Sequence, residues 1–429
     1  MKGLAYAAAA VVLTATFPAQ GAEITRTISG FEDNASFPLG IDLQVGYDRE
    51  QHRALINREN HQSGDIVDVA ELRLTETTQT LPIRLAIGIW HDLEIHAMLP
   101  IVLGWTREYG YPSITDNASS TVFNNCVTRT GGYDCATAGA FYNPNNEVHR
   151  SGVGNLTVGT AFAVLSEKRD DTKPTWVIGF DYTFPLADAI DPALTTSPTS
   201  PGAVGDKVQR FTPYMAMSKR VGYVDPYLQF SASIPRILGG FYSNCDNPST
   251  LAFPENCPGG GDANSTWSRQ DTGEDPPYYG TLVMGVELYA YDEPSKNQSL
   301  VVDLRGTGQF VSQGRYYNEM SDQLGKLLET EQYFHMGGTL GINARAAQYV
   351  ELRLAASYFH DTDHFLTNEN VGNDLNGNGR VDLPATPSTP DNTGELNPNY
   401  DFRWDGVGRR FRISQVNDFY FSATGVLTF

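Results

Sequence analysis

The sequence predicts an all-β protein: an antiparallel up-and-down transmembrane β-barrel of about 12 strands, with short periplasmic turns and long extracellular loops. Three observations support this fold class. Apolar and polar residues alternate with a period of two along about a dozen segments, as in strands with one apolar face. The connections between these segments alternate between short and long. The chain also combines an export signal with an aromatic last residue.

Residues 1–21 have the pattern of a secretory signal peptide. Lys2 precedes a short apolar run, and Ala19-Gln20-Gly21 provides a small-residue cleavage site. The run is shorter than the roughly 20 apolar residues that span a bilayer as a helix. We expect cleavage after Gly21 or Ala22, so that residues 22–429 form a single barrel domain.

The first strand illustrates the alternation. In LGIDLQVGYD, Leu39, Ile41 and Leu43 share one face, whereas Asp42 and Gln44 share the other. Segments of this kind lie near 39–57, 65–89, 93–107, 151–167, 174–187, 207–219, 224–234, 278–292, 299–313, 329–345, 349–359 and 416–429. The second segment changes phase between residues 74 and 81, which predicts a β-bulge.

The connections show which rim each strand end belongs to. Short turns follow the second, fourth, sixth, eighth and tenth segments, and a modest loop lies at 58–64. The long loops are 108–150, 188–206, 235–277, 314–328 and 360–415. This rhythm is typical of an up-and-down barrel with one short-turned rim and one long-looped rim. An even strand number places both termini on the short-turned, periplasmic side.

The last strand, DFYFSATGVLTF, explains why the chain ends on a phenylalanine. Phe429, Leu427 and Phe421 share an apolar face, whereas Ser422 and Thr424 face the other way. In a bilayer a sheet must close, because every backbone polar group needs an internal partner. We therefore expect the last strand to pair with the first. The terminal aromatic residue also resembles the assembly signal of Gram-negative outer-membrane barrels.

The composition excludes some partners and suggests disulfides. With 30 Lys and Arg against 50 Asp and Glu, the formal net charge is −20, which argues against nucleic acid as a partner. The four cysteines form two pairs that are local in sequence. In an exported protein this spacing predicts the disulfides Cys126–Cys135 and Cys245–Cys257.

One hairpin carries a family resemblance. Residues 88–105, GIWHDLEIHAMLPIVLGW, resemble a hairpin of the outer-membrane family named after the meta-pathway of phenol degradation. The matching residues are Gly88, Trp90-His91-Asp92, Leu93-Glu94-Ile95 and Leu99-Pro100. Residues 151–162, SGVGNLTVGTAF, are similar to a second family motif, with Asn155 in place of its usual Asp. The resemblance implies an outer-membrane channel and a link to aromatic compounds.

The polar strand faces predict which side chains line the lumen. They are Asp42, Arg84, Glu94, His96, Asp181, Glu287, Asp303, Arg305, His335, Glu351 and Arg353. Charges inside a narrow barrel are costly unless they are hydrated or paired. Two interpretations follow: a polar conduit with a ladder of arginines, or a salt-bridged core that plugs the barrel. A wide pore is not expected, because twelve strands enclose less space than the 16–18 strands of porins.

A glycine-rich stretch suggests a cofactor. DLNGNGRVD, residues 374–382, follows the first nine positions of a calcium-binding loop. The expected ligands are Asp374, Asn376, Asn378, Arg380 through its carbonyl, and Asp382. The twelfth position is Ala385 instead of a bidentate Glu, so we expect weak binding unless Asp391 or Glu395 completes the shell.

Two further motifs are given less weight. YFHDTDHF, residues 358–365, holds two His and two Asp. These residue types suit a zinc or catalytic site, but one metal could bind both His side chains only if the segment turns, so we interpret them as solvated loop charges. His149 precedes Ser151 by two residues, as at outer-membrane phospholipase sites, but the expected neighbouring Asn is absent. We therefore do not expect an enzyme.

Taken together, these patterns predict an outer-membrane channel or transporter for passive, substrate-restricted movement of small solutes, hydrophobic or aromatic ones by the family resemblance. Its partners would be outer-membrane lipids, the barrel assembly machinery and the solute. The alternative is a non-transporting surface barrel whose disulfide-stapled acidic loops bind a partner or calcium. The sequence leaves the oligomeric state open.

Overall fold

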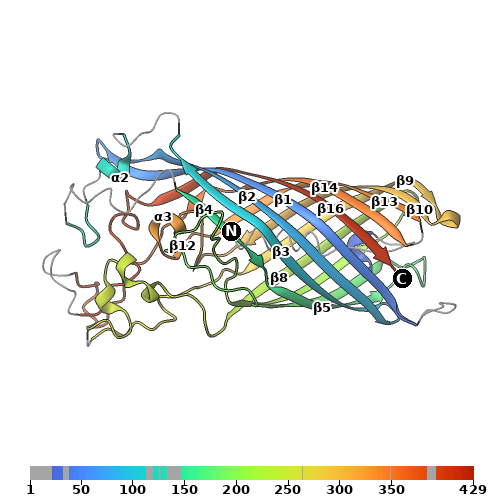
Figure 1. The fold of residues 1–429 in the computed structure, drawn as a ribbon, viewed down its shortest axis with the longest axis horizontal. Coiled ribbons are helices and arrows are strands. Elements are labelled where there is room, and N and C mark those ends of the chain that lie inside the picture. Colours follow the sequence, from blue (N-terminus) through green and yellow to red (C-terminus); the bar gives the residue numbers. More distant parts are fainter. Residues whose placement is uncertain are drawn as a thin grey trace.

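The computed structural model describes residues 22–31, 38–112, 119–124, 127–132, 146–262, 264–347, 349–383 and 393–429. Within them the chain forms a closed antiparallel β-barrel of twelve strands (Figure 1). The wall consists of β1 (Gly40–Gln62), β2 (Asp65–Trp90), β3 (Leu93–Gly110), β5 (Leu156–Leu165), β6 (Thr175–Phe184), β7 (Val208–Ser218), β8 (Val224–Ile237), β9 (Tyr279–Glu293), β10 (Gln298–Val311), β13 (Tyr333–Ala347), β14 (Val350–Asp361) and β16 (Phe411–Thr428). The predicted fold class is confirmed. The predicted signal peptide and the Cys126–Cys135 pair lie outside the described residues.

Short strands and helices lie outside the twelve strands of this wall. Strand β4 (Glu147–Val153) pairs with β3, β15 (His364–Phe365) pairs with β16, and β11 (Gly314–Tyr316) pairs with β12 (Leu328–Thr330). The helices are η1 (Glu23–Thr25), α2 (Thr121–Asn124), η2 (Asn244–Asp246), η3 (Pro248–Thr250), η4 (Pro254–Asn256), η5 (Pro294–Lys296) and α3 (Ser321–Leu324). No helix in these ranges is long and apolar enough to cross a membrane.

The barrel closes as the last strand predicted. The β1–β16 ladder runs from Asp42 opposite Thr428 to Arg58 opposite Phe411. Beyond it, Ile41 and Phe429 exchange two backbone hydrogen bonds of 3.1 and 2.8 Å. The sheet therefore has no free edge between its first and last strands, as a bilayer would require.

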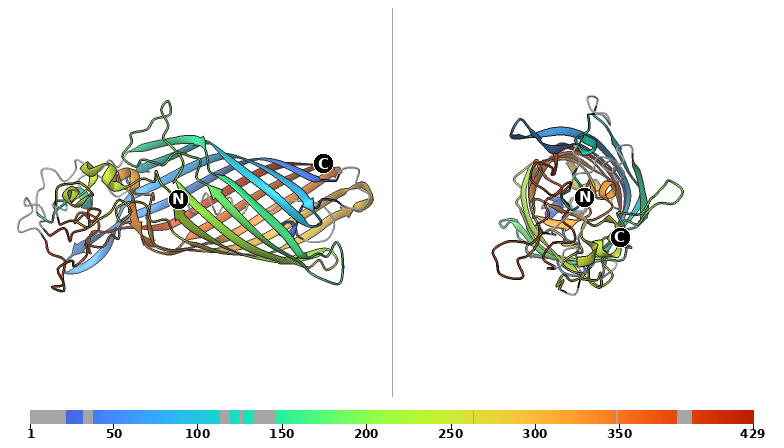
Figure 2. Two further views of the ribbon diagram at one scale, coloured as in Figure 1. Left: turned by 90° about the horizontal axis from the view of Figure 1, so that it is seen from below. Right: turned by 90° about the vertical axis from the view of Figure 1, so that its left-hand side faces the viewer.

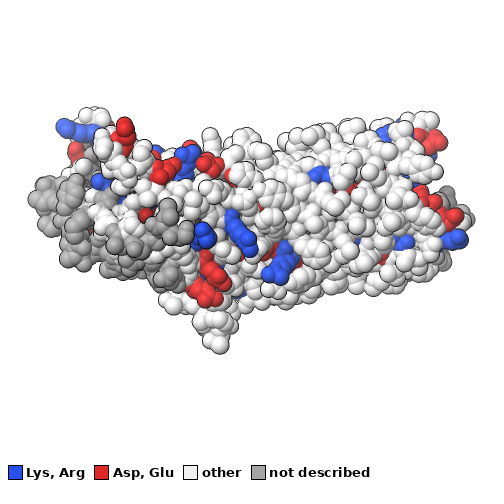
Figure 3. Space-filling view, turned by 90° about the horizontal axis from the view of Figure 1, so that it is seen from above, with Lys and Arg blue, Asp and Glu red and all other residues white. Residues whose placement is uncertain are grey.

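The two faces of the wall differ in chemistry. Val45, Leu304 and Phe421 point outward and are exposed, whereas Asp42 and Gln44 point inward and are buried. The outer surface has a mostly uncharged band towards one end, with charged side chains gathered near the rims (Figure 3). An apolar outer face and a polar inner face are typical of β-barrels that span a lipid bilayer.

We call the two ends the turn rim and the loop rim. The turn rim carries the short connections after β2, β5, β7, β9 and β13 and the end of β16, whereas the β1–β2 turn and the long connections lie at the loop rim (Figure 2). The predicted loop 58–64 is shorter than expected, because Ser63 and Gly64 both adopt positive φ angles of 54° and 98°. This backbone suits a two-residue hairpin turn, so β1 and β2 continue almost to its tip.

The register confirms one prediction and corrects another. The expected bulge in β2 appears as a register shift between Gln79 and Thr80 opposite β3. The single strand expected at 151–167 is instead split into β4 and β5. The split falls at Gly154, where a Cβ atom would lie 2.8 Å from the Pro100 side chain, and the Asn155 amide binds Asp206 at 3.0 Å.

Candidate functional site in the barrel lumen

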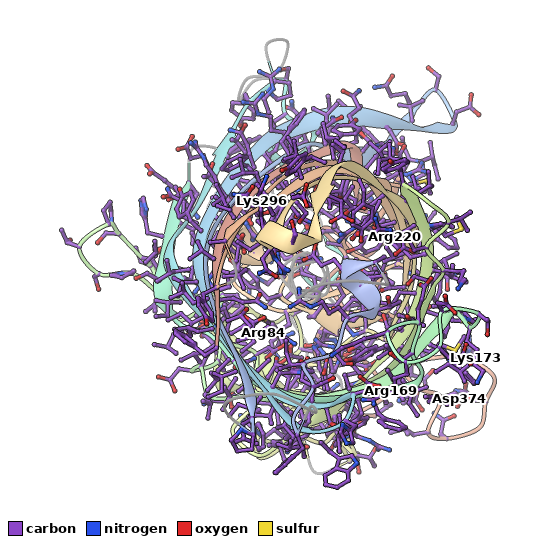
Figure 4. The ribbon with its side chains drawn as sticks, turned by 90° about the vertical axis from the view of Figure 1, so that its right-hand side faces the viewer. Arg84, Arg169, Lys173, Arg220, Lys296 and Asp374 are labelled. Carbon is purple, nitrogen blue, oxygen red and sulfur yellow. A yellow bond between two sulfur atoms is a disulfide. The ribbon has the colours of Figure 1, made fainter. Side chains whose placement is uncertain are left out.

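The structure places all eleven predicted lumen residues on the inner face of the wall. Ten of them are at most 8% exposed, and the side chain of Arg305 is also 8% exposed. The charged interior expected from the alternation is therefore present. Figure 4 looks into the ring from the turn rim, with Arg84 labelled among the inner side chains.

The first charged group joins four of the predicted residues. Arg84 Nη2 lies 2.5 Å from Glu94 Oε1, and the same oxygen lies 3.0 Å from His96 Nδ1. The other ring nitrogen of His96 lies 2.9 Å from Asp181 Oδ1. Each charge thus has an opposite partner, which buried ionic groups need.

The second set of charged pairs lies on β10 and β14. On β10, Arg305 lies 2.5 Å from Asp303, and the Tyr227 hydroxyl donates to the same carboxylate. On β14, which β13 separates from β10, Arg353 Nε lies 2.6 Å from Glu351. The arginines are therefore paired with acids and do not form an unpaired ladder.

Residues 22–30 occupy the turn-rim end of the lumen, and we call them the N-terminal segment. In Figure 4 its helix η1 lies inside the ring of strands. Ala22 donates its backbone N–H to Ser218 Oγ at 3.1 Å, and Glu23 donates its own to Glu287 at 2.7 Å. The Glu23 carboxylate lies 3.0 Å from Arg353.

Further contacts hold the segment where it enters the barrel. Ile28 donates to Glu94 at 2.9 Å, Ser29 Oγ donates to Asp92 at 2.8 Å, and Gly30 donates to the Trp90 carbonyl at 2.9 Å. The segment thus contacts β3, β7, β9 and β14 across the lumen. No periodic pattern in the sequence pointed to this position.

Residues 312–332 fold into the loop-rim end, and we call them the inward loop. It carries β11, α3 and β12, and the last two lie within the outline of the barrel in Figure 1. Met320, Leu324 and Leu328 are buried against inner residues of β1 and β2, including Ile56 and Leu72. The loop-rim end is therefore filled by a packed apolar core.

Polar contacts fix the inward loop as well. The Asp322 carboxylate lies 3.0 Å from Arg107 and 2.8 Å from Arg150. The Tyr317 ring lies between these two guanidinium groups, with centroid distances of 4.7 and 4.9 Å. Arginine stacked on an aromatic ring and paired with a carboxylate has little rotational freedom.

A cavity lies beside the inward loop at the loop rim. Its volume is about 370 Å³, and its lining includes Arg129, Glu147, Leu194, Leu324 and Trp404. This volume and mixed lining lie within the range of small-molecule sites in proteins. None of the lining residues was among those predicted to line the lumen.

Residues 238–262, 264–278 and 393–410 form a cover above the cavity, which we call the loop cap. The predicted disulfide Cys245–Cys257 is present there, with a Cα–Cα distance of 5.7 Å. The Asn244 amide donates to Asn399 at 2.7 Å and to the Leu327 carbonyl at 3.0 Å. The loop cap is thereby tied to the inward loop.

The expected calcium ligands lie on an exposed turn at the edge of the loop cap. Asp374 accepts backbone N–H groups from Gly377 and Gly379, each at 2.7 Å. The bond from Gly379 lowers the pKa of Asp374. The Glu395 carboxylate accepts the N–H of Asp382 at 2.7 Å. The five residues thus share one turn, and Glu395 lies beside it.

The interpretation of residues 358–365 as solvated loop charges is wrong for two of the four. Asp361 and His364 are buried. Strand β14 extends to Asp361, which lies 2.5 Å from His335 Nδ1. The rings of His364 and Tyr333 stack with their centroids 4.0 Å apart.

His149, the histidine of the pair compared with phospholipase sites, lies 3.0 Å from the Glu147 carboxylate.

Comparisons with known proteins return distant structural similarities. No family model and no curated protein matches. An outer membrane channel from Pseudomonas putida F1 matches with 13% identity and a TM-score of 0.41, over 92% of this chain and 98% of that one. A Pseudomonas aeruginosa FadL homologue matches with 8% identity and a TM-score of 0.36, over 91% and 90% of the two chains. The P. putida toluene transporter TodX matches with 9% identity and a TM-score of 0.32, over 91% and 90%. Likenesses this distant support no statement about what this chain binds.

Proposed function

We propose that the chain is an outer-membrane channel of a Gram-negative cell for substrate-restricted movement of small solutes. In this proposal the loop rim faces outward and the turn rim faces the periplasm. The apolar outer face and the polar inner face support a membrane location. Outer-membrane lipids and the barrel assembly machinery would then be its partners.

One observation carries the transport proposal. The N-terminal segment fills the turn-rim end of the lumen and precedes β1 in the chain. We expect cleavage behind Gly21 to leave Ala22 as a chain end. Hydrogen bonds such as Ala22 to Ser218 and Glu23 to Glu287 hold the segment, and Ala22 and Ile24 pack with Tyr227 and Val283 in a small apolar cluster. Because these contacts are few compared with the strand ladders of the wall, we propose that the segment leaves the lumen while the wall stays intact.

The cavity at the loop rim bears on the solute class. Leu194, Leu324 and Trp404 give it apolar surface, whereas most of its lining is polar, including Arg129 and Glu147. Such a lining suits a small, partly apolar molecule. We propose a small hydrophobic or aromatic solute, in line with the family resemblance of residues 88–105.

The test compares single channels of two purified proteins in a planar bilayer. One is the natural chain and the other has residues 23–29 replaced by a glycine–serine stretch of equal length. We expect brief openings in the first and long, larger openings in the second. Liposome flux of benzyl alcohol and of glucose then tests the solute class, with faster benzyl alcohol flux expected. Silence from both folded proteins would contradict the channel.

The fixed contacts within the loop cap favour a second function, that of a non-transporting surface barrel whose loops bind a partner. The Asn244 contacts and the Cys245–Cys257 disulfide fix its surface, and fixed surfaces bind partners with less loss of entropy. A barrel that is silent in both forms would be assigned this role.

We also propose weak calcium binding at residues 374–382. The turn places Asp374 and Asp382 on one exposed stretch with the Asn376 and Asn378 side chains between them. Extracellular calcium sites of this kind have dissociation constants of roughly 10⁻⁴ to 10⁻³ M. Calorimetry with the natural chain and with Asp374→Ala should show binding that the substitution removes. Equal binding by both proteins would exclude this site.

A further inference from the structure

Four strands bring two histidines and two aspartates together inside the lumen, near the loop rim. The registers place His52 of β1 opposite Asp418 of β16, and His335 of β13 opposite Asp361 of β14. In the wall, β16 lies between β1 and β14, so the two pairs are neighbours. We call these four residues the His–Asp cluster.

The distances show that Asp418 joins the two pairs. His52 Nδ1 lies 2.5 Å from Asp418 Oδ1, and His335 Nδ1 lies 3.9 Å from Asp418 Oδ2. His335 Nδ1 lies 2.5 Å from Asp361 Oδ1. All four side chains are at most 4% exposed.

The His–Asp cluster also leaves polar atoms without partners. Asp418 Oδ2, His335 Nε2 and His52 Nε2 are buried and accept or donate no hydrogen bond within the described chain. An unpaired buried polar atom costs roughly 1–3 kcal/mol. The His96 group shows the contrast, because both of its ring nitrogens have carboxylate partners. The His–Asp cluster therefore has the capacity for a further ligand.

We propose that the His–Asp cluster binds one divalent transition-metal ion of the zinc class. His335, Asp361 and Asp418 would supply the protein ligands, and water would complete the shell. Their ligand atoms all lie within 4.8 Å of one another. Binding displaces the proton shared by His335 and Asp361, which leaves to solvent.

The distances between the ligand atoms suit tetrahedral coordination of an ion after small side-chain movements. Donor atoms around zinc, with bonds of about 2.0 Å, lie about 3.3 Å apart. The His335–Asp361 distance of 2.5 Å is shorter than this, and the His335–Asp418 distance of 3.9 Å is longer. These two separations change by less than about 1 Å when an ion enters, and the Asp361–Asp418 separation, which is at most 4.8 Å, changes by at most about 1.5 Å.

The surroundings hold the ligands in place. His52 Nδ1 donates to the Asp418 carboxylate, and the His335 ring stacks on Phe359 with centroids 4.6 Å apart. Such outer partners orient metal ligands and raise affinity. A nitrogen donor with two carboxylates favours zinc-class ions over calcium, which takes six to eight oxygens.

An ion bound at the His–Asp cluster would link neighbouring strands of the wall. The three ligands join β13, β14 and β16, and His52 extends the network to β1 across the closure of the barrel. A ligand that binds only the folded state stabilises it. We therefore expect zinc to raise the melting temperature of the barrel, whether or not the lumen conducts.

The experiment uses the untagged barrel, refolded with zinc or first refolded with chelator and then given zinc. Elemental analysis after gel filtration measures bound zinc, and calorimetry measures affinity. We expect one bound zinc ion per barrel after at least one of the two refolding procedures. His335→Gln and Asp361→Asn should bind at least 10-fold more weakly, and His52→Gln roughly 10- to 100-fold more weakly.

A matched control is His149→Gln, which removes a histidine–carboxylate pair outside the His–Asp cluster and should keep the wild-type equivalent. Heat-modifiable migration on gels verifies that each variant has folded. If His335→Gln does not fold, the isosteric Asp361→Asn decides. No bound zinc by either route, or an undiminished equivalent in a folded cluster variant, would overturn the proposal.

Discussion

The two ends of the lumen are filled in different ways. At the loop rim, Met320, Leu324 and Leu328 of the inward loop pack into an apolar core with β1 and β2. At the turn rim, the N-terminal segment is held by hydrogen bonds, by the Glu23–Arg353 ion pair and by a smaller apolar cluster in which Ala22 and Ile24 pack with Tyr227 and Val283. The larger apolar core at the loop rim opens only when its packing is lost. We therefore expect the loop-rim end to contribute more to stability and the turn-rim end to open first.

The largest expected effect tests the packed end. Leu328→Ala removes a fully buried side chain, and such changes typically destabilise a protein by about 2–5 kcal/mol. Thermal or denaturant melting of the folded barrel measures the loss. Leu375→Ala, at an exposed loop position, is the control. An unchanged melting curve for Leu328→Ala would contradict the claim that the apolar core at the loop rim stabilises the barrel.

The next effect concerns the loop cap above the packed end. Replacing Cys245 and Cys257 by serine opens a link between residues 12 apart in sequence, and links of this length contribute roughly 3 kcal/mol. We expect faster proteolysis within 238–278 and an unchanged barrel melting temperature. A matching drop in barrel stability would show that the loop cap and the wall unfold as one unit.

A smaller effect tests the polar end. Glu23→Ala removes the carboxylate that pairs with Arg353 and accepts from Asn343 at 2.7 Å. Losing such contacts costs about 1–3 kcal/mol, while Arg353 keeps Glu351 as a partner. We expect roughly a tenfold rise in the ratio of open to closed time in single-channel records, with little change in melting. Leu328→Ala should show the opposite pattern.

The smallest expected effect is a pH dependence of the loop cap. Burial raises the pKa of Asp405 to about 7, above the ordinary value of about 3.9. Its carboxylate accepts the N–H groups of Asp401 and Glu369, and Lys326 lies nearby. A raised pKa favours the folded loop cap at low pH, and this contribution is lost as pH rises from about 4 through about 7.

Hydrogen exchange of residues 393–410 at pH 5 and pH 8 measures this change. We expect slower exchange at pH 5, after correction for the intrinsic rates. Asp405→Asn imitates the protonated carboxyl group and should remove the difference. A pH effect that persists in this variant would have to come from another group.

The wall was predictable because alternation is a local pattern. Each strand carries its own period of two, so β10 or β14 can be recognised without its neighbours. The pattern does not say whether an alternating stretch belongs to the wall. Residues 329–345 were expected to form one strand, but Leu328–Thr330 belongs to the inward loop as β12 and the wall strand begins at Tyr333.

The contents of the lumen were less predictable, because they depend on contacts between distant residues. The sequence identified His335 as facing inward, but its meeting with Asp361 and Asp418 requires the registers of three strands. The N-terminal segment has no periodic pattern, and its place depends on Ser218, Glu287 and Arg353, which lie on three separate strands. The choice between a conduit and a plugged barrel therefore required the structure.

The N-terminal segment also constrains the order in which the molecule assembles. Its contacts reach β3, β7, β9 and β14, which surround a common interior only once the sheet has curled. Ile41 and Phe429 exchange the last hydrogen bonds of the seam, and residues 22–30 end only about ten residues before that point. The segment must already lie inside when the seam closes, or else thread in afterwards. In the first case the wall finishes folding around residues 22–30, and in the second these residues enter a wall that has already closed.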